Sequence, residues 1–143
     1  MEALTYIIKT GLLIFLFLSA MIDLRQKSLG FNFLCIAFTL GFLLQTIAGN
    51  LSLWLLIGGA ALGGFFAVIS LLSRQALGLG DSFLIGVCGA WLGLYSGILL
   101  LLCTFFILSA VGIFALALKK AKAKNSLPFA PFLLAGYIAV LAI

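Results

Sequence analysis

Long apolar runs fill the chain, and short polar stretches separate them. Six runs can be distinguished, at about residues 3–22, 30–48, 51–72, 82–95, 97–118 and 127–143. A helix needs roughly 20 apolar residues to cross the hydrocarbon core of a bilayer, and most of the runs reach or approach that length. The pattern therefore predicts an all-α protein with about six transmembrane helices in one domain, residues 1–143, in which the fourth helix is short.

The composition supports an integral membrane protein. Of the 143 residues, 66% are hydrophobic and 8% are charged, and the mean hydropathy is +1.41. A soluble domain of this size would leave too much of that apolar surface in water. We expect the first run to be retained rather than removed as a signal peptide, because Glu2 precedes it and the apolar stretch is long.

The basic residues predict how the chain is oriented. Seven of the eight follow the first, third and fifth runs: Arg25, Lys27, Arg74, Lys119, Lys120, Lys122 and Lys124. By the positive-inside rule these stretches are cytoplasmic and both termini lie outside, with Lys9 as the exception. The net charge of +5 thus reflects topology in the cytoplasmic (inner) membrane, and we expect contact with the lipid bilayer and no nucleic-acid partner.

Carboxylates are scarce in this chain, which contains only Glu2, Asp23 and Asp81. Asp23 follows the first run and Asp81 precedes the fourth, so the predicted topology places both at the cytoplasmic face. An ionisable residue at a membrane segment is costly and is by default a functional hypothesis. Two aspartates on one face suggest that they act as a pair.

The other side chains limit the chemistry that is open to the protein. Histidine is absent, and Cys35, Cys88 and Cys103 lie inside apolar runs without metal-ligand spacing, so we expect no metal and no cofactor. Peptide hydrolysis by direct attack of water needs one carboxylate as base and one carboxylic acid as proton donor. Two aspartates about 3 Å apart share a proton and can take these two roles.

Glycines flank the residue before Asp81. We predict that Gly78 and Gly80 lie in a loop, where they remove side-chain bulk and allow unusual backbone angles near the acid. The alternative is that Asp81 only caps the following helix, whose N–H groups and dipole favour a carboxylate. The residues of this segment alone leave both interpretations open.

Other glycines recur four residues apart within the apolar runs. The pairs are Gly59 and Gly63 in the third run, and Gly89 and Gly93 at the fourth. Such small-residue spacing lets membrane helices approach closely. We therefore assign these glycines to helix packing and to no chemistry.

Four segments in order resemble the type IV prepilin peptidase family, membrane aspartyl proteases of the GxGD type. They are DLR at 23–25, GLGD at 78–81, GAWLG at 89–93 and PFAPF at 128–132. The resemblance implies a six-helix membrane fold and catalytic roles for Asp23 and Asp81 at the cytoplasmic face. It also implies that the substrates are pilin-like precursors, cut between a short basic leader and a hydrophobic helix. Pro128 would shape the start of the sixth helix.

The chain departs from the family pattern at two places. Phe83 stands where the family usually has lysine, two residues after the GxGD aspartate, and Leu29-Gly30 stands where an Ile-Pro pair is usual. In addition, the stretch after the first run is only a few residues long. The cytoplasmic segment with paired cysteines of the bifunctional members does not fit there, and no N-methyltransferase activity is expected.

Two alternatives to a leader peptidase remain at this point. A small transporter or ion-conducting protein would use the aspartates as proton or cation sites. Transporters commonly show repeats and interrupted helices near mid-membrane, whereas these aspartates lie at one edge. The other alternative keeps the fold but makes the protein a non-catalytic relative, and the departures at Phe83 and Leu29-Gly30 motivate it.

Overall fold

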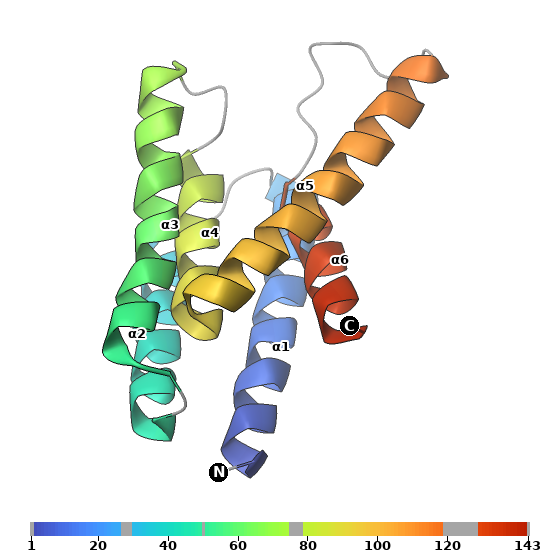
Figure 1. Cartoon of the computed structure of the whole chain (residues 1–143). Coiled ribbons are helices and arrows are strands. Elements are labelled where there is room, and N and C mark those ends of the chain that lie inside the picture. Colours follow the sequence, from blue (N-terminus) through green and yellow to red (C-terminus); the bar gives the residue numbers. More distant parts are fainter. Residues whose placement is uncertain (1, 27–29, 50, 75–78, 119–128, 143) are drawn as a thin grey trace.

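The computed structural model describes residues 2–26, 30–49, 51–74, 79–118 and 129–142, and every element in these ranges is a helix (Figure 1). In chain order the helices are α1 (Glu2–Gln26), α2 (Phe31–Ala48), α3 (Leu53–Leu72), α4 (Leu79–Leu92), α5 (Leu94–Ala117) and α6 (Phe129–Ala142). The six predicted apolar runs correspond one to one to these helices. The prediction of an all-α fold is confirmed.

Helix length separates these elements into two groups. α1, α2, α3 and α5 are long and apolar enough to cross a membrane, so the chain is a multi-pass membrane protein. α4 and α6 are apolar helices of 14 residues each in the described part of the chain. The short fourth helix is as predicted, whereas the sixth had been expected to begin near Leu127, and its described part begins at Phe129.

The boundaries next to the two aspartates differ from the prediction. α1 continues past the apolar run to Gln26, because Leu24, Arg25 and Gln26 are good helix formers and Arg25 in the last turn complements the helix dipole. Asp23 is therefore inside the helix. α4 begins at Leu79, so Gly80 and Asp81 lie in its first turn, and the expected loop around them is wrong at these residues. Gly78 lies outside the described residues.

α4 also ends earlier than predicted, because a single residue separates it from α5. Gly93 has φ +83° and ψ 177°, a conformation that side chains disfavour and glycine adopts freely. The chain reverses at this residue, and α5 begins at Leu94. From this turn α5 runs diagonally away from α4 and passes α6 (Figure 1).

Glycines fix the close packing of α3 on α4, as their spacing predicted. A Cβ atom on Gly59 would collide with the carbonyl oxygen of Gly89, and one on Gly63 would collide with the Cα atom of Gly86. Because these contacts are with backbone, no side-chain movement relieves them. The two helices lie side by side only while these positions carry no side chain, and α4 is buried along most of its length as a result.

Trp91, in the GAWLG segment, attaches α4 to α2. Its indole N–H donates to the carbonyl oxygen of Ala37 at 2.9 Å, and the Gln45 amide donates to the carbonyl oxygen of Trp91. A side chain at Gly41 would overlap the indole ring. This segment therefore has a structural function, holding α4 between α2 and α3.

α6 runs antiparallel to α1. The buried Tyr137 hydroxyl donates to the carbonyl oxygen of Lys9 at 3.0 Å, and near the other end of the contact the Ala130 N–H meets Asp23. Leu133 lies between these two contacts and is fully buried, as is Leu16 on α1. This packing fixes α6 along α1 and places the N-terminal turn of α6 beside the last turns of α1.

Candidate active site

Asp23 is buried at the meeting point of α1 and α6. Its side chain is 7% exposed, and one carboxylate oxygen accepts a hydrogen bond from the Ala130 N–H at 3.3 Å. The first N–H groups of a helix have no partner within the helix, and the positive end of the helix dipole lies there. The first turn of α6 thus supplies both a donor and a favourable potential to a carboxylate that is removed from water.

Pro131 follows directly in that turn of α6. Proline is well tolerated at the start of a helix, because its missing N–H would have had no partner there and its fixed φ suits the helix. The turn is therefore preorganised with the Ala130 N–H directed at Asp23. Pro128, which was expected to shape the start of this helix, lies outside the described residues.

Asp81 reaches the same region from α4, where it is partly buried in the first turn. This turn is outside the four long helices that can cross a membrane. Burial, and then the negative charge of Asp23, raise the pKa of Asp81 from 3.8 to about 6. Because the charge of Asp23 contributes to this rise, the two aspartates that the sequence singled out lie near enough in the fold to interact electrostatically.

Gly80 leaves space next to Asp81. A Cβ atom at this position would meet no atom within 4 Å, so internal packing does not require glycine there. Gly80 lies in a helical turn and not in a loop, and its role in giving a substrate access to Asp81 stays a prediction.

The arrangement contains the elements of acid–base chemistry by a carboxylate pair. The described residues hold no group of three or more histidine, cysteine or acidic side chains that could bind a metal ion. Two neighbouring carboxylates in a partly dehydrated site do not ionise independently, and their titration belongs to the pair. Such a pair can accept a proton from water with one member and donate a proton with the other.

Phe83 lies away from the pair. Successive residues of a helix are rotated by about 100°, so Phe83 points roughly opposite to Asp81 on α4. Its ring packs edge-on against Phe31 of α2, with the ring centres 5.2 Å apart. Position 83, which usually carries lysine in the prepilin peptidase family that the sequence resembles, therefore faces α2 in this chain.

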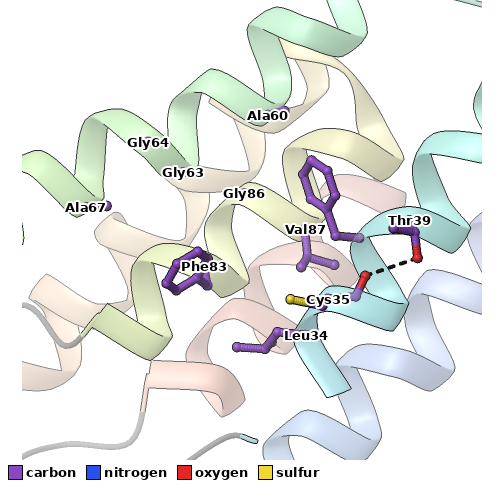
Figure 2. Close-up of a pocket in the computed structure, with 11 residues that line it drawn as sticks. Leu34, Cys35, Thr39, Ala60, Gly63, Gly64, Ala67, Phe83, Gly86 and Val87 are labelled. Carbon is purple, nitrogen blue, oxygen red and sulfur yellow. Dashed lines mark hydrogen bonds between the residues drawn. The ribbon is translucent and has the colours of Figure 1, made fainter. Parts of the chain in front are cut away.

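An apolar groove of about 280 Å³ lies on that other side of α4. Leu34, Cys35 and Thr39 of α2, Gly64 of α3, and Phe83 and Val87 of α4 are among the residues that line it (Figure 2). The Thr39 hydroxyl already donates to the Cys35 and Ile36 carbonyl oxygens. The groove therefore offers an apolar surface and is separated from the carboxylates by α4.

Sequence reasoning missed one contributor to the site, the Ala130 N–H. A backbone donor leaves no trace in residue type, and only the PFAPF segment indicated that the start of the sixth helix mattered. Pro131 is the signal that could have located the donor, because a proline inside an apolar run marks the first turn of a helix.

Comparison with known proteins gives one match. A model of the type IV leader peptidase family matches residues 10–117. The match includes Asp23 with the larger part of α1, and Asp81 with all of α4, and it covers well over half of the chain. Neither the curated proteins nor the solved structures contain a match to this chain.

Proposed function

Because the chain belongs to the type IV leader peptidase family, we propose that it is a membrane aspartyl endopeptidase that removes the leader peptide from pilin-like precursors. The observation that carries the proposal is the family match, which spans both aspartates, and the contribution of the Asp23 charge to the raised pKa of Asp81 supports it. Two carboxylates, 58 positions apart in the chain, come together at one end of the helix bundle, within the segment that the family model matches.

The proposed reaction uses the pair to activate water directly. One carboxylate removes a proton from a water molecule, which attacks the carbonyl carbon of the peptide bond, while the other carboxyl group donates a proton. An aspartate pair performs this chemistry without a histidine, a serine nucleophile or a bound metal. It suits a chain that has no histidine.

The proposed location of the cut is the cytoplasmic face of the membrane. Arg25 lies in the last turn of α1, two residues after Asp23, and Arg74 follows the end of α3; both side chains are exposed. The positive-inside rule places such residues on the cytoplasmic side. A precursor with a short leader and a hydrophobic helix would present its cleavable bond at this level, with the helix in the bilayer.

The test is processing of a pilin-like precursor by the purified protein in lipid nanodiscs. We expect the wild type to release the leader, and Asp23→Asn and Asp81→Asn each to lower kcat/KM by about 10²–10⁴-fold, since each removes one of the two proton-transfer groups. Glu2→Gln is the matched control, because it also neutralises a carboxylate but lies at the other end of α1, and it should process normally.

Other outcomes would contradict the proposal. Normal processing by either aspartate variant would rule out the pair as the catalytic group. A well-folded wild type that cuts no pilin-like precursor would indicate a non-catalytic relative. Ion or proton flux into proteoliposomes that depends on Asp23 or Asp81 would favour a transport protein.

A further inference from the structure

The two carboxylates of the site have different surroundings, and the difference begins with α6. Asp23 is linked to Ala130 across 107 positions of the chain, so the contact exists only because α6 packs along α1. The Tyr137–Lys9 hydrogen bond and the fully buried Leu133 hold that packing. The donor therefore has a fixed position relative to Asp23.

Few other groups can affect the charge on Asp23. On α1 and the helices packed against it, the titratable or charged side chains that the structure describes are Glu2, Tyr6, Lys9 and Arg25 on α1, Cys35 on α2, Asp81 and Cys88 on α4, and Tyr137 on α6. Tyr137 donates to the Lys9 carbonyl far along α1 from Asp23, and Arg25 is exposed. The Ala130 N–H and Asp81 remain as the neighbours that can decide which member of the pair carries the proton.

We propose that the first turn of α6, through the Ala130 N–H, holds Asp23 in its ionised form, so that Asp23 is the base and Asp81 the acid. This inference rests on the proposed peptidase function. A hydrogen bond to a charged acceptor at a helix N-terminus stabilises the anion. Among the described residues no backbone donor from another helix meets Asp81, and burial, followed by the charge of Asp23, makes Asp81 the member of the pair that keeps a proton more readily.

The roles give a balanced reaction. Asp23 takes a proton from water as the water oxygen bonds to the carbonyl carbon, and the carbonyl oxygen takes the proton of Asp81, which leaves a tetrahedral diol. The C–N bond then breaks. The departing nitrogen takes the proton that Asp23 had gained, and a diol hydroxyl returns a proton to Asp81. Both carboxyl groups end in their starting forms.

The decisive experiment removes the N–H and leaves every side chain unchanged. Lactic acid in place of Ala130, introduced by cell-free translation into nanodiscs, turns the amide into an ester with the same methyl group. The matched control places lactic acid at Ala135, which is also in α6 and further from Asp23. The Ala135 ester loses a donor inside α6, whereas the Ala130 N–H at the helix start has no partner within the helix, so a general weakening of α6 should be at least as large in the Ala135 control.

The readout is the rate of precursor processing as a function of pH. We expect the ester at Ala130 to move the rising, acidic limb to higher pH by on the order of one unit, since one unit corresponds to the loss of one charge-assisted hydrogen bond. The Ala135 ester should leave both limbs in place. Equal profiles for the two esters would overturn the inference. Movement of the falling, alkaline limb alone would mean that Asp23 is the acid, which also overturns it.

Carbodiimide labelling tests the charge assignment without turnover, because the reagent modifies protonated carboxyl groups. Near pH 5, about midway between the ordinary and the raised pKa values of an aspartate here, we expect mass spectrometry to find label on Asp81 and not on Asp23. The Ala130 ester should bring label to Asp23 as well. This pattern in a protein that cuts no precursor would remove the proposed function and leave the assignment standing, whereas label on Asp23 of the wild type would overturn the assignment.

Discussion

The surroundings of Asp23 and Asp81 differ in almost every respect. Asp23 lies near the end of a helix of 25 residues, is buried, and accepts an N–H from the start of another helix. Asp81 lies in the first turn of a helix of 14 residues, is partly exposed, and has open space beside the adjacent Gly80. A hydrogen bond from the Ala130 N–H holds the Asp23 carboxylate. Burial and the like charge of Asp23 instead raise the pKa of Asp81. Pairs of titratable groups whose surroundings separate their proton affinities are the ones that can act as acid and base.

The largest expected effect tests whether the two different sites act as one unit. We expect the double variant Asp23→Asn/Asp81→Asn to have a kcat/KM within a few fold of either single variant, after a first loss of about 10²–10⁴-fold. Once one proton-transfer group is missing, the remaining aspartate cannot carry out the reaction alone, so removing it as well causes little further loss of rate. Kinetics of precursor cleavage in nanodiscs measure this. A double variant that is slower than both singles by the product of their losses would show that the aspartates act independently.

The second effect concerns the proton on Asp81. Because its pKa is raised to about 6 by burial and then by the charge of Asp23, we expect processing to decline above pH 6, by about tenfold per unit once the proton is lost. The same shift has a consequence for stability, because the folded protein holds this proton more tightly than the unfolded chain. That contribution is complete below pH 3.8 and is lost as the pH rises through about 6.

Thermal unfolding of Asp81→Asn measures the stability side of this prediction. The amide is neutral at every pH, so the variant should gain in Tm relative to the wild type as the pH rises from 4 to 8. The Glu2→Gln variant, which lies far from the pair, provides the control for a general effect of lost charge. A difference in Tm between wild type and Asp81→Asn that does not change with pH would contradict a raised pKa in the folded state.

The pair itself could be predicted from the sequence, but the difference between its members could not. Scarcity of carboxylates and the positive-inside pattern predicted that Asp23 and Asp81 share one membrane face, and this prediction required no knowledge of packing. The donor to Asp23 is a backbone group that any residue except proline supplies, so position 130 carried no signal of its own. The helical state of Gly80 was missed because glycine usually marks a loop, whereas the first turn of α4 tolerates it.

The packing of the helices shows the same limit. The four-residue glycine spacing predicted close helix approach, and Gly59 and Gly63 do contact the backbone of α4. Gly64 is the next glycine along α3 and belongs to the same type of spacing with Ala60, yet a Cβ atom there would meet nothing within 4 Å. Sequence spacing shows that small residues cluster, and only the fold shows which of them face another helix.

The smallest expected effect uses the adjacent Gly63 and Gly64 to test whether the packing that positions Asp81 is independent of the packing that positions Asp23. Gly63→Ala would drive a methyl group into the backbone of Gly86 and push α4, with Asp81, away from α3, at a cost of roughly 1–3 kcal/mol. Gly64→Ala adds the same methyl group where there is space, and we expect it to stabilise α3 by up to about 1 kcal/mol through helix propensity.

Because Asp23 is held from α6 and not from α3, the acidic limb of the pH profile of processing should stay in place in both variants. Thermal unfolding and the pH profile of processing measure the two quantities. Equal Tm values for the two variants, or an acidic limb that moves with Gly63→Ala, would mean that the supports of Asp23 and Asp81 are not separate.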